Sequence, residues 1–234
     1  MKNWHHTQKE KILKWQAKAL RNYLKHTVYP FSSYYQKVFD EHHFDPSSIR
    51  SIMDLEKLPL SSKSDIAPTE ENPGKPREFI LIPDKAQLAR RPSVIASTLL
   101  KGRKHTQNAL EQEFRPIFMT STTGRSAEPT PFFYTRHDIK NLEIAGGRLI
   151  EIGGATQEDR ILNMFPYAPH LAYWLAHYAA VSRNIYCLSS GGGKVMGTDG
   201  NIQMMKKIKP TILVAMPTFI YHVLHQAIEE KLEL

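Results

Sequence analysis

The chain has 234 residues, of which 41% are hydrophobic, 10% aromatic and 23% charged. This balance excludes a mostly disordered chain, and the length allows one or two domains with a substantial core. A single cysteine, Cys187, excludes a disulfide framework and a cysteine-based zinc site, so we expect a reducing, cytoplasmic location. The first residues lack the apolar region of a signal peptide, and we expect no membrane span.

The net charge of +8 is confined to the first part of the chain. Residues 1–105 carry 19 Lys or Arg and 11 Asp or Glu, whereas residues 106–234 carry 12 of each. Such an excess can attract nucleic acid, an anionic membrane or a polyanionic ligand, although a solvated helix face is the commoner reason for it. Acidic residues are interspersed and no aromatic–basic RNA motif is present, which argues against nucleic acid.

Residues 1–78 are predicted to form a helical N-terminal region. Apolar residues at helical spacing predict a helix over residues 10–26, which Pro30 is expected to interrupt. The capping residues expected for the next helices are Ser32 or Ser33, Asp54, and Ser61 or Ser62. Residues 69–79 are typical of an exposed connector, and residues 81–112 leave helix and strand open.

Residues 79–234 are predicted to form an α/β subdomain. Strands are expected at residues 115–120, 131–135, 160–166, 184–189 and 211–216, and helices at residues 137–154, 170–182, 201–209 and 217–234. This alternation predicts βαβ units and a mainly parallel sheet with flanking helices. The residues expected on one face of the first helix are Ile139, Leu142, Ala145, Leu149 and Ile152.

Two segments contain the ingredients of a phosphate site. Backbone N–H groups, hydroxyls and a glycine occur together in TSTTG (residues 120–124), although such a segment can also be a simple turn. The glycine-rich run at residues 189–200 fails the P-loop pattern, because Val195 follows Lys194 where Ser or Thr is required. We interpret this run as a flexible turn whose backbone could line the carboxyl edge of the sheet.

The segment FMTSTTGRSAEPTPFFYTRHDI resembles the phosphate loop of the adenylate-forming superfamily, above all its phenylacetate–CoA ligase and coenzyme F390 synthetase branch. In that branch a strand and a Tyr-Thr-x-x-Asp step follow the loop, here Tyr134, Thr135 and Asp138. Residues 20–66 and 209–224 are also similar to the branch. The resemblance implies the large N-terminal domain of an adenylate-forming enzyme, with residues 79–234 as an incomplete subdomain that binds nucleotide and acyl group.

The family reaction implies Mg-ATP, a small-molecule carboxylic acid and coenzyme A. The acid would become an acyl-adenylate and then a thioester. The residues expected to bind ATP phosphates are Thr120, Ser121, Thr122, Thr123, Gly124 and Arg125. Those expected near the acyl group are Tyr167, His170, Pro217 and Thr218, with helix capping as the alternative role of His170. The histidines show no metal-ligand spacing, and no catalytic residue can be assigned.

The sequence departs from the family in three ways. Residues 125–128 intervene before Pro129, where the family goes almost directly to proline. Ser121 replaces a motif glycine, which would restrict the loop if that backbone needs a positive φ. The later motifs that hold magnesium, bind ribose and supply a lysine do not occur before Leu234. We therefore expect the N-terminal part of a ligase that is not competent alone. The alternatives are an inactive remnant and a basic binding module for nucleic acid or an acidic partner, and a homodimer is a possible assembly.

Overall fold

The computed structural model describes residues 6–122, 129–168 and 170–231. Its contacts divide the chain into two compact units, residues 1–109 and 110–234. The boundary between them falls inside helix α7 (Arg103–Phe114). The domain division predicted at residue 78 therefore stays a prediction. Within the described ranges, none of the helices has the length and apolar character needed to cross a membrane.

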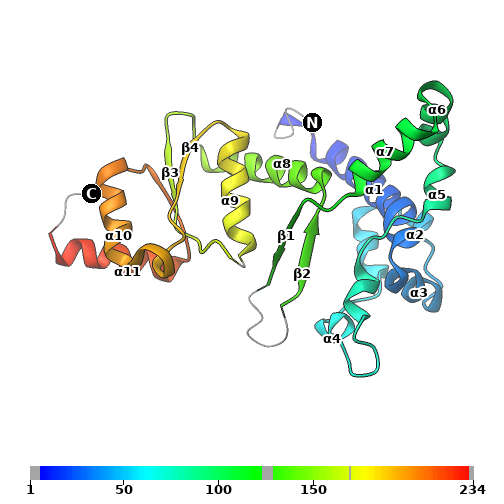
Figure 1. Cartoon of the computed structure of the whole chain (residues 1–234), viewed down its shortest axis with the longest axis horizontal. Coiled ribbons are helices and arrows are strands. Elements are labelled where there is room, and N and C mark those ends of the chain that lie inside the picture. Colours follow the sequence, from blue (N-terminus) through cyan, green and yellow to red (C-terminus); the bar gives the residue numbers. More distant parts are fainter. Residues whose placement is uncertain (1–5, 123–128, 169, 232–234) are drawn as a thin grey trace. The chain divides into compact units, whose positions relative to one another are not determined.

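The first unit is a succession of short helices, as predicted (Figure 1). They are α1 (Lys9–Tyr23), a π-helix (Leu24–Val28), α2 (Tyr29–Phe31), α3 (Ser33–Glu41), α4 (Lys63–Ile66), α5 (Lys85–Ala89), α6 (Pro92–Lys101) and α7. In addition, 3-10 helices span Pro46–Ser48, Ile52–Lys57 and Lys75–Phe79. The segment that could have been helix or strand is thus helical.

Hydroxyl side chains begin these helices. Ser32 is the N-cap of α3, and its Oγ accepts a hydrogen bond from the backbone N–H of Tyr35 at 3.3 Å. Ser62 occupies the same position before α4. Asp54, predicted as a cap, lies instead inside the first turn of its 3-10 helix. The cap is Ser51, whose backbone N–H donates to the Asp54 carboxylate at 2.8 Å, and the two residues form a capping box.

Pro30 does not interrupt the first helix, contrary to the prediction. The chain stays helical up to Phe31, and the five-residue π-helix just before α2 absorbs the proline. Proline lacks the N–H that would bond to the carbonyl oxygen of His26. That oxygen instead accepts a hydrogen bond from the Arg91 guanidinium at 3.5 Å. The buried core of this unit comprises Leu24, Val28, Phe39 and Ile49.

The second unit begins with an antiparallel hairpin, β1 (Phe118–Ser121) and β2 (Pro131–Tyr134). Phe118 pairs with Tyr134, and Ser121 with Pro131. Pro131 is tolerated because it is the first residue of its strand. The two strands predicted on either side of the hydroxyl segment are confirmed.

The rest of this unit is a three-stranded parallel sheet in the order β4-β3-β5, with helices between its strands (Figure 1). The strands are β3 (Arg160–Asn163), β4 (Tyr186–Ser189) and β5 (Ile212–Val214). The helices are α8 (Arg136–Gly153), α9 (Leu171–Ser182), α10 (Gly193–Ile208) and α11 (Pro217–Glu229). This arrangement confirms the predicted fold class.

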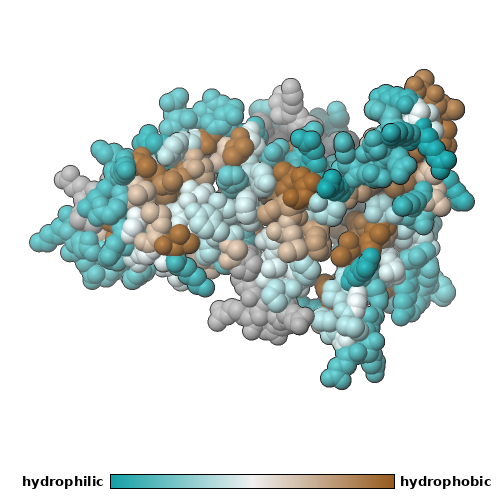
Figure 2. Space-filling view, viewed as in Figure 1, coloured by the Kyte–Doolittle hydropathy of each residue, from teal (hydrophilic) through white to brown (hydrophobic). Residues whose placement is uncertain are grey.

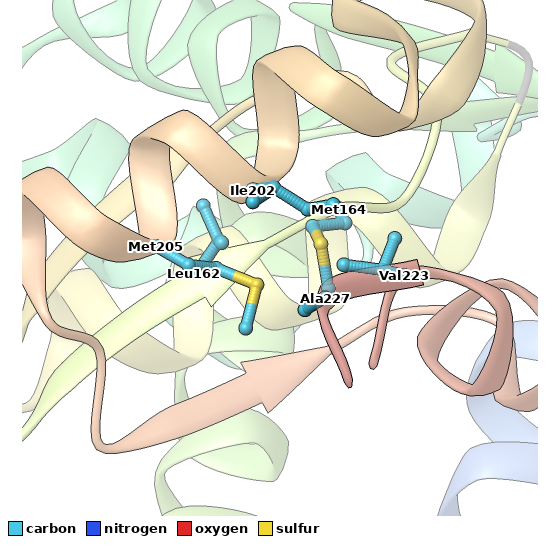
Figure 3. Close-up of a cluster of buried hydrophobic side chains, with 6 residues drawn as sticks. All are labelled: Leu162, Met164, Ile202, Met205, Val223 and Ala227. Atoms are coloured by element: carbon cyan, nitrogen blue, oxygen red, sulfur yellow. The ribbon is translucent and has the colours of Figure 1, made fainter. Parts of the chain in front are cut away.

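The central strand β3 supplies core residues to both faces of the sheet, because successive side chains of a strand point in opposite directions. Ile161 packs with Ala180 of α9 on one face. On the other, Leu162 packs with Met205 of α10 and Val223 of α11 (Figure 3). Helices α8 and α9 therefore lie on one side of the sheet, and α10 and α11 on the other.

Two buried glycines bring helix α8 close to α9. A Cβ added at Gly146 would lie only 2.6 Å from the Cβ of Ala179, so the two helices approach closely. Gly147 is buried beside Arg183 in the same way. On the face predicted to be apolar, Leu149 and Ile152 are instead exposed, at 54% and 70%. Close approach of two helices thus decides which side of α8 is covered.

Candidate functional site

The hydroxyl-rich segment starts at the end of β1. Thr120 is 7% exposed, Ser121 is half-buried, and Thr122 follows the strand. Ser121 has the extended backbone of a strand residue, so its replacement of a glycine causes no strain here. The predicted phosphate ligands that lie outside the described residues are Thr123, Gly124 and Arg125.

Thr122 holds the base of the hydroxyl segment through two hydrogen bonds with Thr130. Its backbone N–H donates to the carbonyl oxygen of Thr130 at 3.1 Å. Its Oγ1 accepts from the backbone N–H of the same residue at 3.0 Å. The hydroxyl can still donate its own proton to a phosphate oxygen. Thr122 is therefore a structural residue as well as a candidate ligand.

The Tyr-Thr-x-x-Asp step forms the start of α8. Thr135 is the N-cap, and its backbone N–H and hydroxyl both donate to the Asp138 carboxylate, at 2.8 and 2.7 Å. Burial, and then the negative charge of Asp138, raise the pKa of the Tyr134 phenol. The motif thus sets where the chain leaves the hairpin and enters the helix.

The predicted acyl residues gather at the carboxyl edge of the parallel sheet. Tyr167 follows β3, whereas Pro217 and Thr218 form the first turn of the helix after β5. Strands β3 and β5 are neighbours, but the helices that follow them lie on opposite faces. Open α/β sheets bind ligands at such a switch point. The topology therefore brings these three residues to one place in the fold.

Tyr167 joins the loops that follow β3 and β4. Its hydroxyl donates to the carbonyl oxygen of Ser189 at 2.7 Å, and burial raises the pKa of the phenol. A Cβ at Gly191 would lie 2.4 Å from the Tyr167 ring, so only a glycine at this position allows the ring to pack this closely against the loop. The side chain is 40% exposed and can therefore meet a ligand.

The glycine-rich run is not a flexible turn, contrary to the prediction. Helix α10 begins at Gly193 and is broken once, at Gly197, where φ is 66°. A Cβ at Gly192 would lie 2.4 Å from the carbonyl oxygen of Met164, and one at Gly193 would lie 2.8 Å from the ring of Phe219. These glycines serve close packing at the sheet edge.

Three buried polar side chains that the sequence did not single out support this edge: Asn163, Ser190 and Asn201. The Ser190 hydroxyl donates to Asn201 Oδ1 at 2.6 Å, and Asn201 Nδ2 donates to the carbonyl oxygen of Gly197 at 2.6 Å. Asn163 Nδ2 donates to the carbonyl oxygen of Tyr173 at 3.2 Å. Isolated polar residues form no sequence pattern, so only the structure reveals this network.

A chain of aromatic rings connects the two predicted sites. Phe118 of β1 lies 4.6 Å from Trp174 of α9, Trp174 lies 5.0 Å from Tyr173, and Tyr173 lies 5.0 Å from Tyr167 (centroid distances). Edge-to-face contacts of this kind contribute about 0.5–1.5 kcal/mol each beyond the burial of the rings. The hairpin and the sheet edge are thereby held in a fixed relation within this unit.

Two histidines of this region differ in their surroundings. His170 is at the N-cap position of α9, but its side chain makes no capping hydrogen bond. His177, which the sequence did not indicate, packs beside Tyr173, and its Nδ1 is buried with no hydrogen-bond partner among the described residues. Over the same residues, no group of three His, Cys, Asp or Glu side chains is placed to hold a metal ion.

Comparison with known proteins gives no matching family model. Three curated relatives are phenylacetate–coenzyme A ligases. Those of Escherichia coli (strain K12) and Aromatoleum evansii are each 22% identical over 211 residues, and that of Pseudomonas putida is 21% identical over 205. They cover 88–90% of this chain, whereas the chain spans only 38–40% of their length.

The fold also matches solved structures of 2-hydroxyisobutyryl-CoA ligase. One of them, in complex with 2-HIB-AMP and CoA in the thioesterification state, has a TM-score of 0.74 and 18% identity. It covers 97% of this chain and 41% of the ligase. The resemblance seen in the sequence is confirmed: this chain is similar over nine-tenths of its length to phenylacetate–coenzyme A ligases and has the fold of the N-terminal part of a CoA ligase.

Proposed function

We propose that this chain is the nucleotide- and acyl-binding part of an ATP-dependent carboxylate–CoA ligase, and that it does not complete the reaction alone. The observation that carries the proposal is the chain of rings from Phe118 to Tyr167, which joins the hydroxyl hairpin to the carboxyl edge of the sheet. Acyl-adenylate formation needs a phosphate site and a carboxylate site held in a fixed relation.

The hairpin is the proposed phosphate site. Thr122 has a hydroxyl proton to donate while its oxygen bonds to Thr130, and the hydroxyl of Thr123 follows directly. Donors of this kind stabilise the charge on phosphate oxygens. Arg125 is an additional cation next to this segment in the sequence. Mg²⁺ and coenzyme A are predictions that rest on the similarity to CoA ligases alone.

The carboxyl edge of the sheet is the proposed place for a small carboxylic acid. Tyr167 offers an aromatic face there, and Pro217 and Thr218 present the N-terminal turn of the 13-residue helix α11. A carboxylate is favoured near a helix N-terminus. His170, at the start of α9, is the fourth residue proposed to border the acid. A cytoplasmic location and a homodimer remain predictions.

Titration calorimetry of the chain with Mg-ATP tests the phosphate site. We expect weak binding that falls about ten- to hundredfold in Thr122→Ala and in Thr123→Ala, because each removes a hydrogen bond to a charged group. Thr122→Ser is the matched control, since serine keeps a hydroxyl for both Thr130 and phosphate. We expect it to bind as the parent chain does.

Two results would reject this assignment. Mg-ATP binding that is indifferent to both alanine variants would place the nucleotide elsewhere. No measurable binding by a folded chain would favour the inactive remnant. Thioester formation from an acid, ATP and coenzyme A by this chain alone would contradict the second half of the proposal.

A further inference from the structure

Helix α6 carries its apolar side chains on the side that faces solvent. Ile95, Leu99 and Leu100 are 48%, 82% and 83% exposed, and Pro92 and Ala96 are exposed with them. The spacing of these residues is that of one helical face. In Figure 2 hydrophobic residues gather over α6, directly beside hydrophilic ones. An apolar face turned toward water indicates a surface that meets another molecule.

The inward side of α6 is polar, so the helix is not simply apolar all round. Ser97 and Thr98 are partly buried. Thr106 of α7 donates a hydrogen bond to Ser97 Oγ at 3.1 Å, and Thr98 Oγ1 donates to the carbonyl oxygen of Val94 at 2.7 Å. The first bond links α6 to α7 and the second lies within α6, and both are on the side away from the apolar stripe. The orientation is therefore part of the fold.

Basic side chains lie at both ends of this apolar stripe. Arg90 precedes α6, and Lys101, Arg103 and Lys104 follow its apolar residues; all four are exposed. Residues 85–110 contain no Asp or Glu. A second copy of the chain is a poor occupant, because two such surfaces would bring like charges together. This surface is complementary to a partner that is both apolar and anionic.

Nucleic acid carries the negative charge but has no aliphatic surface against which Leu99 and Leu100 could pack. Sites for single strands combine cations with aromatic side chains that stack on bases, and residues 85–110 contain no Phe, Tyr or Trp. An amphipathic helix with basic flanks instead lies in the boundary between lipid headgroups and acyl chains, attracted by anionic lipids. We propose that α6, with the cations that flank it, docks this chain on an anionic membrane surface.

Vesicle co-sedimentation of the whole chain tests this docking. We expect binding to phosphatidylcholine vesicles that contain phosphatidylserine, and little binding to phosphatidylcholine alone. The double variant Leu99→Gln, Leu100→Gln should weaken the partition at least about tenfold, because it removes apolar burial without changing charge. High salt should weaken binding of the parent chain, since it screens the cations.

Leu60→Gln is the matched control, because Leu60 is 97% exposed in the same unit but lies outside α6. It should bind vesicles as the parent chain does, and circular dichroism should show all variants folded. The membrane assignment is overturned if zwitterionic and anionic vesicles bind equally, or if the double variant binds unchanged. It is equally overturned if the chain ignores vesicles and binds an oligonucleotide or an acidic protein instead. The Mg-ATP titration is independent of this result.

Discussion

Gly192 shows how closely the backbone is packed at the sheet edge. Its φ of 69° and ψ of −161° fall in a backbone region that only glycine adopts without strain. An added Cβ would lie 2.4 Å from the carbonyl oxygen of Met164. We expect Gly192→Ala to lower the free energy of unfolding by at least about 2 kcal/mol in urea denaturation. Gly153→Ala is the control, because nothing lies within 4 Å of its added Cβ. Equal losses in the two variants would contradict this account.

Asp159 makes the second unit sensitive to acid. Its carboxylate accepts hydrogen bonds from the Thr156 backbone N–H and the Thr211 hydroxyl, both at 2.7 Å. These bonds, the backbone one first, hold its pKa below the usual 3.8. A carboxyl with a lowered folded-state pKa stabilises the fold fully at neutral pH, and this contribution is lost as the pH falls from about 4 through the lowered pKa.

We therefore expect Asp159→Asn to have a lower thermal midpoint than the parent chain at neutral pH, and the difference to shrink in acid. Thermal unfolding of both chains across this range measures it. A difference that stays constant with pH would show that the charge of Asp159 is not what matters.

At the scale of elements, the contact between α8 and α9 gives a matched pair of substitutions. The Cβ of an alanine at position 146 would lie 2.7 Å from the backbone Cα of Ala179. One at Gly147 would meet the Arg183 side chain, which can move away. We expect Gly146→Ala to destabilise the chain by about 1–3 kcal/mol and Gly147→Ala by less. Chemical denaturation distinguishes them, and the reverse order would mean that α8 can shift as a whole.

The sequence predicts elements best where a local signal decides them. Ser32 begins a helix because its hydroxyl accepts a hydrogen bond from a free backbone N–H group, and Ser62 begins one through a capping box with Asp65. Both signals depend on a few neighbouring residues. Gly193 begins a helix although glycine disfavours one, because the ring of Phe219 and the sheet edge pack against it. Contacts between distant residues override local preference there, and the sequence alone does not show them.

At the scale of the whole molecule, exposed apolar side chains are the notable feature of the second unit. Leu149 and Ile152 of α8 are 54% and 70% exposed, and Met119 of β1 is 58% exposed. We expect the chain to self-associate as its concentration rises, and Ile152→Lys to reduce this without changing the unfolding midpoint. Sedimentation velocity measures the association.

Ile150→Lys is the matched comparison, because Ile150 packs against the core around Ile161. We expect that variant to unfold more easily, since it buries a charge. If both lysine variants lower stability alike, then Ile152 is covered in solution.

Part of the candidate site could be predicted, because the alternation of strands and helices is a local pattern in the sequence. Tyr167 and Pro217 follow strands that alternate with helices, and parallel strands bring their carboxyl ends to one edge. The buried pair Ser190 and Asn201 could not be foreseen, because a single polar residue in a chain is far more often at the surface. Burial, rather than residue type, identifies such a pair.

The π-helix before Pro30 has a consequence for how this chain can vary in length. A π-helical turn holds one residue more than an α-helical turn, so removing one residue between Leu24 and Val28 would leave a continuous α-helix. Five residues of a π-helix turn the chain about as far around the axis as four residues of an α-helix, so α1 would keep the same face toward the core. Ala17, now 5% exposed, would stay buried. A gene deletion of three bases here would thus be absorbed within the turn instead of rotating α1.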